Sequence, residues 1–149
     1  MPIQFALVGA TGVGKTNLSL SLAEKSEAEI ICVDSRQLYS DFCIGTAQPT
    51  KEELKRVPHH LVHFLNPENS YSAGQFCKDV RQIVEANLEK NYILVGGTGL
   101  YLQSLILGLP QIPTIEEKIK SQIKESLQQE GLQSLYTKAL EVDQVAMER

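Results

Sequence analysis

Three short apolar runs stand out along the chain because they are rich in β-branched residues and do not alternate with polar positions. They cover residues 3–8, 29–33 and 92–95. Continuous apolar runs of this length are typical of parallel strands that helices cover on both faces. A weaker stretch, residues 61–65, could form a further strand. The pattern therefore predicts a buried parallel sheet.

Helical segments with local start signals separate these runs. Residues 15–24 place Leu18 and Leu22 on one face. Thr50 and Glu53 have the spacing of a capping box, for a short helix that must end before the Val57-Pro58 pair.

Ser72 and Gln75 mark the start of a longer helix, in which Tyr71 can pack on Phe76. Its expected apolar face consists of Phe76, Val80, Ile83, Val84 and Leu88. Strands that alternate with helices indicate a three-layer α/β domain, doubly wound, with right-handed crossovers.

The pattern changes after Gly108. The segment "LPQIP" is a turn-rich connector, and an amphipathic helix with apolar residues at 115, 119, 123 and 127 follows and ends at Gly131. A second helix is expected over residues 132–142. We divide the chain into an incomplete core, residues 1–113, and the start of a helical insertion, residues 114–149.

Composition narrows the class of protein. The 149 residues are 42% apolar, carry a net charge of −4 and contain no dense basic cluster or membrane-length apolar stretch. Without a signal peptide, the default location is the cytoplasm. Cys32, Cys43 and Cys77 suit reduced packing residues. Three or four strands make a thin sheet, so we expect the N-terminal piece of a longer protein.

The strongest motif is "GATGVGKT", which follows the first apolar run and opens a helix. It matches the phosphate-binding loop (P-loop) signature and consists of Gly9, Ala10, Thr11, Gly12, Val13, Gly14, Lys15 and Thr16. Backbone N–H groups of residues 12–16 and the Lys15 ammonium should bind phosphate, and the Thr16 hydroxyl should bind Mg²⁺. A plain glycine-rich turn does not need the Lys-Thr pair.

Asp34 and Thr98 follow the other two apolar runs, at the edge where parallel sheets bind ligands. The residues alone leave three roles open for Asp34: holding Mg²⁺ through water, accepting a proton, or capping a turn. Ser35, Arg36 and Gln37 follow it and could contact a base or sugar, or form a solvated loop.

The three histidines of "PHHLVHF" are only a weak indication of a metal site. No carboxylate or thiol lies at ligand spacing near His59, His60 and His63. We interpret the first two as loop residues and the third as a neighbour of an apolar run.

Five segments in this order resemble the tRNA dimethylallyltransferases: "GATGVGKT", "VDSRQLY", "IGTAQPT", "PHHLVHFLNPENSYSAGQF" and "LVGGTGLYLQSLILGL". The resemblance implies a P-loop NTPase-like fold and transfer of a dimethylallyl group from dimethylallyl diphosphate to N6 of the adenosine beside the tRNA anticodon. Diphosphate would be the leaving group and Mg²⁺ the cofactor.

The resemblance also assigns roles to residues. Asp34 matches the family's general base, residues 9–16 hold the diphosphate with Lys15 as a catalytic cation, and Thr98 lies near the reactive adenosine. It implies tRNA contacts from Asp34, Ser35, Arg36, Gln37, Thr98 and Lys120. The partner is the anticodon stem-loop, and the full-length protein is expected to be a monomer.

Two departures from the family pattern matter. The family commonly has lysine at Gln48, and its downstream half, with an arginine-containing tRNA segment, is not in this chain. The alternatives are an adenylate isopentenyltransferase that modifies a free nucleotide, a small P-loop kinase or ATPase, and a binding module without activity. Against a kinase, the third apolar run ends in Gly96-Gly97 and not in an acidic residue.

Overall fold

Four parallel strands form the centre of the first part of the chain. The computed structural model describes residues 2–42, 44–110 and 115–147. The strands are β1 (Ile3–Val8), β2 (Ala28–Val33), β3 (His59–His60) and β4 (Asn91–Gly96). Their order across the sheet is β1-β4-β2-β3, and every neighbouring pair is parallel. The three main strands lie where the apolar runs predicted them, within one residue at each end.

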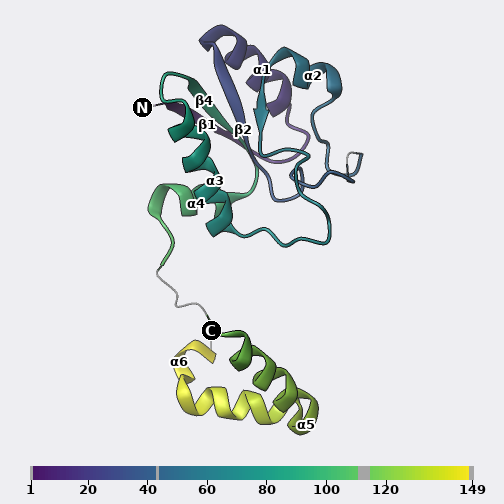
Figure 1. Ribbon diagram of the computed structural model, residues 1–149, viewed down its shortest axis with the longest axis vertical. Helices are drawn as coiled ribbons and strands as arrows, with labels where there is room; N and C mark the ends of the chain where they lie inside the picture. Colours follow the sequence, from purple (N-terminus) through teal and green to yellow (C-terminus); the bar gives the residue numbers. More distant parts are fainter. Residues whose placement is uncertain (1, 43, 111–114, 148–149) are drawn as a thin grey trace. The chain divides into compact units, whose positions relative to one another are not determined.

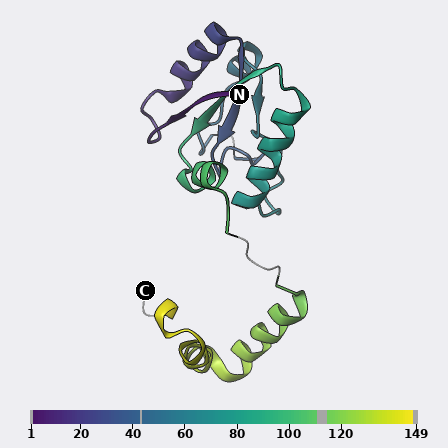
Figure 2. The ribbon, with the colours of Figure 1, turned by 90° about the vertical axis from the view of Figure 1, so that its left-hand side faces the viewer.

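Helices cover both faces of this sheet. They are α1 (Lys15–Ser26), α2 (Lys51–Arg56), α3 (Ala73–Ala86) and α4 (Gly99–Leu107). Helices α1 and α2 lie on one face, α3 and α4 on the other (Figure 1). Figure 2 shows α1 and α3 on opposite sides of the strands. The expected α/β architecture is confirmed.

Strand β2 contributes side chains to both hydrophobic layers, because successive side chains point to opposite faces of the sheet. Ile30 and Cys32 pack in the cluster that includes Leu20 of α1. Ile31 and Val33 pack in the cluster that includes Phe76 of α3. All six residues of β2 are buried, and each large apolar side chain removed from water contributes about 1.5–3 kcal/mol. The central strand therefore anchors both layers.

The predicted helix starts are borne out where the sequence carried caps. Thr50 and Glu53 form the reciprocal capping box of α2, and the helix ends at Arg56. The Ser72 hydroxyl accepts a hydrogen bond from the Gln75 amide at 3.1 Å, at the start of α3. Leu88 is an exception to the predicted apolar face, because α3 ends at Ala86 and Leu88 is exposed.

The expected strand over residues 61–65 was wrong. The strand at this edge is β3, which pairs Ile30 with His59 and Ile31 with His60. The chain then turns away, because Leu61 and His63 both have positive φ angles, which a strand does not tolerate. In the predicted region, Leu65 forms an isolated bridge with Tyr39.

The prediction that residues 3–8 form a buried strand was also wrong in part. Strand β1 exists, but among the described residues it lies at the edge of the sheet and pairs with β4 alone. Phe5 and Val8 are 40% and 56% exposed. A strand is buried only when neighbours and helices cover it, and its apolar sequence does not report whether those neighbours are present.

Residues Pro110–Arg149 form a second compact unit. It contains α5 (Glu117–Val142) and α6 (Gln144–Met147). Gly131 has a φ of 80° and kinks α5 into the two helical segments that the sequence predicted. The predicted domain boundary, between residues 113 and 114, lies outside the described residues.

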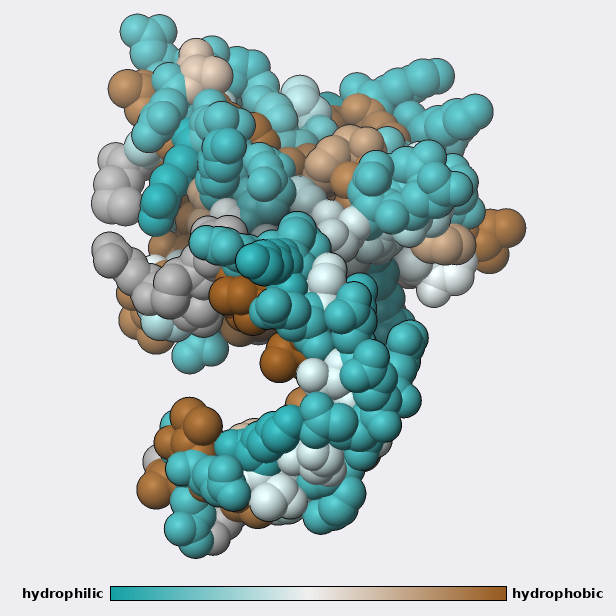
Figure 3. All heavy atoms as spheres, turned by 60° about the horizontal axis from the view of Figure 1, so that its bottom comes forward, coloured by the Kyte–Doolittle hydropathy of each residue, from teal (hydrophilic) through white to brown (hydrophobic). Residues whose placement is uncertain are grey.

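Side chains of α5 remain exposed, including Ile119, Ile123 and Leu127. Hydrophobic side chains also interrupt the hydrophilic surface in several places on the face drawn in Figure 3. Among the described residues, no helix has both the length and the apolar character that a membrane span requires.

Gly96 allows β2 and β4 to approach closely at their carboxyl ends. A Cβ atom at this position would lie 2.0 Å from the carbonyl oxygen of Val33. The neighbouring atom belongs to the backbone, so it cannot move aside as the end of a flexible side chain would. Only glycine fits at the end of β4.

The substitution Gly96→Ala should therefore destabilise the fold by about 3 kcal/mol, the upper part of the usual range for overpacking. Urea unfolding followed by circular dichroism measures the change. Gly99→Ala is the matched control, because a Cβ atom at Gly99 meets nothing within 4 Å. Equal stability of the two variants would contradict this account of the strand ends.

Candidate active site

The carboxyl ends of β1, β2 and β4 meet at one edge of the sheet. The Thr98 amide donates to the Val33 carbonyl at 3.1 Å and ties the segment after β4 to the end of β2. A Cβ atom at Gly97 would lie 3.3 Å from the carbonyl oxygen of Gly9. Three segments that are far apart in the sequence are thus held side by side.

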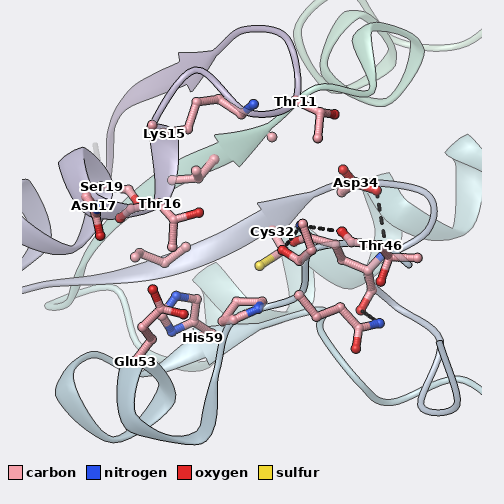
Figure 4. Close-up of a pocket in the computed structure, with 18 of the residues that line it drawn as sticks. Thr11, Lys15, Thr16, Asn17, Ser19, Cys32, Asp34, Thr46, Glu53 and His59 are labelled. Atoms are coloured by element: carbon pink, nitrogen blue, oxygen red, sulfur yellow. Dashed lines mark hydrogen bonds between the residues drawn. The ribbon is translucent and has the colours of Figure 1, made fainter. Parts of the chain in front are cut away.

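A pocket of about 400 Å³ opens at this edge (Figure 4). We call it the P-loop pocket. It is lined by Thr11, Gly12, Gly14, Lys15, Thr16, Asn17, Ser19, Ile30, Cys32, Asp34, Gln37, Thr46, Ala47, Gln48, Pro49, Glu53, His59, Val95 and Gly96.

The loop between β1 and α1 has the conformation that its glycines permit. Gly12 and Gly14 have φ angles of 85° and 88°, which side chains disfavour. The Lys15 ammonium donates to the carbonyls of Gly9 at 2.8 Å and Ala10 at 2.7 Å. An ammonium group has three protons to donate, so one is left for an anion. The lysine is thus held at the loop with its charge available.

Asp34 is oriented by the backbone that follows it. Its Oδ1 atom accepts hydrogen bonds from the amides of Arg36 at 2.9 Å and Gln37 at 3.3 Å. Within the described part of the chain, Oδ2 has no hydrogen-bond partner. The capping role considered from the sequence is therefore present, and it occupies only one of the two carboxylate oxygens.

Thr98 connects the segment after β4 to the segment after β2. Its hydroxyl oxygen accepts a hydrogen bond from the Ser35 amide at 2.9 Å. Thr98 is the N-cap residue of α4, but its side chain makes no capping bond because the hydroxyl faces Ser35 instead. The side chain therefore fixes the backbone next to Asp34.

Two glutamine side chains lock neighbouring loops together. The Gln37 amide donates to the carbonyls of Thr46 at 3.2 Å and Ala47 at 3.0 Å. The Gln48 amide donates in return to the carbonyls of Gln37 at 3.1 Å and Tyr39 at 2.7 Å. Gln48 is buried, and its Oε1 atom has no partner among the described residues. These hydrogen bonds hold together two loops that both line the pocket.

Cys32 lies in the wall but is not a nucleophile. Burial is the main cause that raises the pKa of its thiol to about 12. The thiol therefore stays protonated at neutral pH, and thiols react as thiolates. Cys32 is a packing residue, as the sequence suggested, and Cys77 is buried too. Cys43 lies outside the described residues.

The structure brings together many of the predicted site residues. Those in the P-loop pocket are Thr11, Gly12, Gly14, Lys15, Thr16, Asp34 and Gln37. Gly9, Ala10 and Thr98 line a smaller cavity that Gly96 also lines. Val13 and Arg36 are exposed, and Ser35 is half-buried. Lys120 belongs to the second unit and pairs with Glu117. Their functional roles stay predictions.

Sequence reasoning missed Glu53 and His59 as pocket residues. Glu53 lies in α2, and His59 lies in β3. The sequence alone indicates a helix cap for Glu53 and a loop position for His59, and neither interpretation points to a pocket. No local sequence signal specified that these two residues line a pocket wall.

The family model of the IPP transferases matches residues 37–149, which is more than half of the chain. The chain belongs to the IPP transferase family. This confirms the resemblance that the five sequence segments carried.

Similar proteins extend the match to nearly the whole chain. A tRNA dimethylallyltransferase from Fusobacterium nucleatum is 45% identical over 140 residues, which cover 94% of this chain and 45% of that protein. The solved structure of the full-length tRNA isopentenylpyrophosphate transferase from Bacillus halodurans has 34% identity and a TM-score of 0.69, covering 98% of this chain and 49% of its own.

A third similar protein is a eukaryotic dimethylallyltransferase that acts on tRNA. Its structure shares 26% identity with a TM-score of 0.77, covering 99% of this chain and 37% of its own. The chain therefore spans about half the length of its bacterial relatives, or less. The shared fold confirms the predicted fold class of this IPP transferase family member.

The substitution Thr98→Val should leave the Ser35 amide without its acceptor. We expect a loss of stability of about 1–2 kcal/mol, because an unsatisfied, partly buried donor costs more than a bond gains. Hydrogen exchange of the Ser35 amide, followed by NMR, should become faster. Thr98→Ser retains the hydroxyl and should restore protection. Unchanged exchange in Thr98→Val would contradict the role assigned to this hydroxyl.

Proposed function

We propose that this chain is the N-terminal part of a tRNA dimethylallyltransferase and that its pocket holds the diphosphate of dimethylallyl diphosphate. The observation that carries the proposal is that one pocket contains both the P-loop and the Asp34 carboxylate. The first suits a diphosphate leaving group, and the second suits a proton acceptor. The names of the similar proteins point to the same transfer.

The reaction needs one bond to form and one to break. A bond forms between C1 of the dimethylallyl group and N6 of the adenosine beside the anticodon. The C1–O bond breaks, and the diphosphate leaves with the electron pair. The proton that N6 loses is accepted by Asp34. The N6 lone pair is delocalised into the purine, so removal of this proton assists attack.

Asp34 is well oriented for this proton. Two backbone amides hold Oδ1, at 2.9 and 3.3 Å, and keep the carboxylate plane fixed. Oδ2 is left to face the N6 amine of the adenosine. In the view of Figure 4, Asp34 and Thr46 lie together at one end of the pocket. The adenosine would enter at that end.

The loop residues would stabilise the leaving group. Backbone N–H groups of residues 12–16 and the remaining proton of Lys15 would bind the charge that develops on the diphosphate. Thr16 lines the pocket at the start of α1, and its hydroxyl oxygen is a ligand that suits Mg²⁺. When bound, Mg²⁺ would supply additional positive charge next to the leaving oxygens.

The anticodon stem-loop is the proposed partner. Ser35, Arg36 and Gln37 follow the proposed base directly, and Thr98 contacts Ser35, so these residues are placed to contact the nucleotide near N6. Lys120 of the second unit is proposed as a further tRNA contact. The complete protein would act as a monomer in the cytoplasm.

The whole polypeptide that contains this chain is the protein for the test. It is incubated with dimethylallyl diphosphate, Mg²⁺ and unmodified tRNA, and the nucleosides are analysed by mass spectrometry. We expect N6-dimethylallyladenosine. Transfer to free AMP but not to tRNA would show an adenylate isopentenyltransferase instead, and no transfer to either would reject the proposal.

In the same polypeptide, Asp34→Asn should lower the rate of transfer about 100-fold or more, the usual contribution of a general base. The asparagine oxygen can still accept hydrogen bonds from the amides of Arg36 and Gln37, so the turn is retained. Affinity for dimethylallyl diphosphate, measured by calorimetry, should stay within about twofold. Unchanged transfer would show that Asp34 only caps the turn.

A further inference from the structure

Two hydrogen-bond acceptors besides Asp34 line the P-loop pocket. Glu53 of α2 and His59 of β3 line the P-loop pocket together with Thr16. In the view of Figure 4, both lie on the side of the pocket across from Thr16 and away from Asp34. Neither takes part in the proton transfer proposed above.

The charges of the lining do not suit a bare diphosphate. Lys15 is the one basic side chain among the lining residues, apart from the histidine, and the lining includes two carboxylates, Asp34 and Glu53. Diphosphate adds further negative charge. Like charges at close range repel strongly in a partly buried site. A cation between the phosphates and Glu53 removes this conflict.

His59 presents an acceptor to the pocket and not a positive charge. Its Nδ1 atom lies 2.7 Å from the Val57 carbonyl, so this nitrogen carries the proton and donates. Burial is the main cause that lowers the pKa of the ring. The imidazole is therefore neutral at neutral pH, and its Nε2 atom holds a lone pair.

Glu53 has one oxygen in use and one available. Its Oε2 atom accepts a hydrogen bond from the Thr50 amide at 2.7 Å, as part of the capping box. Within the described part of the chain, its Oε1 atom has no hydrogen-bond partner and the carboxylate forms no salt bridge. The helix thus fixes the carboxylate and leaves half of its accepting capacity for a ligand.

We propose that Glu53 and His59 bind, through water, the magnesium ion that accompanies the diphosphate at Thr16. This inference rests on the proposed function of the pocket. Mg²⁺ keeps several of its water ligands when it binds between a protein and phosphates. Those waters donate hydrogen bonds, and they need acceptors of the kind that Glu53 and His59 provide. The phosphates face the donors of the loop, and the hydrated ion faces the acceptors of α2 and β3.

The first test compares Glu53→Gln with the unchanged protein, both as the whole polypeptide that contains this chain. Glutamine can also form a capping box, so α2 is retained while the charge is lost. The affinity for inorganic diphosphate is measured by isothermal titration calorimetry, once with excess Mg²⁺ and once with EDTA. We expect about tenfold weaker binding with Mg²⁺, as for other groups that orient metal-bound water. With EDTA the affinity should be unchanged or higher, because a repelling charge is gone.

Glu52→Gln is the matched control. Glu52 lies in the same helix and is also acidic, but it is exposed and does not line the pocket. Its substitution should alter neither affinity. An equal loss in Glu53→Gln with and without Mg²⁺ would show that Glu53 acts only on the structure of α2, and would overturn the inference.

A pair of substitutions tests His59. Asparagine can keep a donor near the Val57 carbonyl but does not reach the position of Nε2, whereas glutamine places an acceptor there. His59→Asn should weaken Mg²⁺-dependent diphosphate binding several-fold, and His59→Gln should recover most of the loss. Equal affinities of the two variants and the unchanged polypeptide would remove His59 from the proposed site.

Diphosphate binding by the unchanged polypeptide distinguishes a failure of this inference from a failure of the proposed function. Diphosphate binding that is equally tight with Mg²⁺ and with EDTA would overturn the magnesium site but leave the P-loop pocket in place. An absence of diphosphate binding under both conditions would overturn the assignment of the pocket itself, and with it the magnesium site.

Discussion

The close contact between the carboxyl ends of β2 and β4 is the constraint on which the site depends. Gly96 has no side chain, so its backbone can lie against the Val33 carbonyl. That contact lets the Thr98 amide reach Val33 and the Thr98 hydroxyl reach Ser35. Ser35 follows Asp34 directly, so the carboxylate is positioned by a backbone that two strands hold together. A looser pairing of β2 and β4 would separate the P-loop from Asp34.

The same edge shows how one pocket can serve two chemical tasks. Donors gather on the loop before α1, and acceptors gather on the segments around α2 and β3. An anion and a hydrated cation can then lie next to each other, each against groups of complementary character. Asp34 lies apart from Glu53 and His59 in Figure 4, so in the proposed mechanism its Oδ2 atom would act as the base without competing for the cation.

Sequence reasoning succeeded where the chemistry is local. The P-loop, the strands and the caps at Thr50 and Ser72 each depend on residues within a short segment. It failed at β3, because a two-residue strand exists only through its pairing with Ile30 and Ile31. It also failed for Glu53 and His59, since nothing local reports that their segments return to the loop before α1. Long-range placement decides which polar residues share a pocket.

Strand β1 shows a second limit of sequence reasoning. The segment "IQFALV" has the apolar character of a central strand, but β1 lies at an edge, and Phe5 and Val8 are largely exposed. The apolar sequence of β1 is suited to a strand with a neighbouring strand on each side, and the described residues supply one neighbour, β4. The similar bacterial proteins are about twice as long. An apolar edge strand of this kind is costly to leave in water, so the sequence of β1 favours a neighbour that the described residues do not supply.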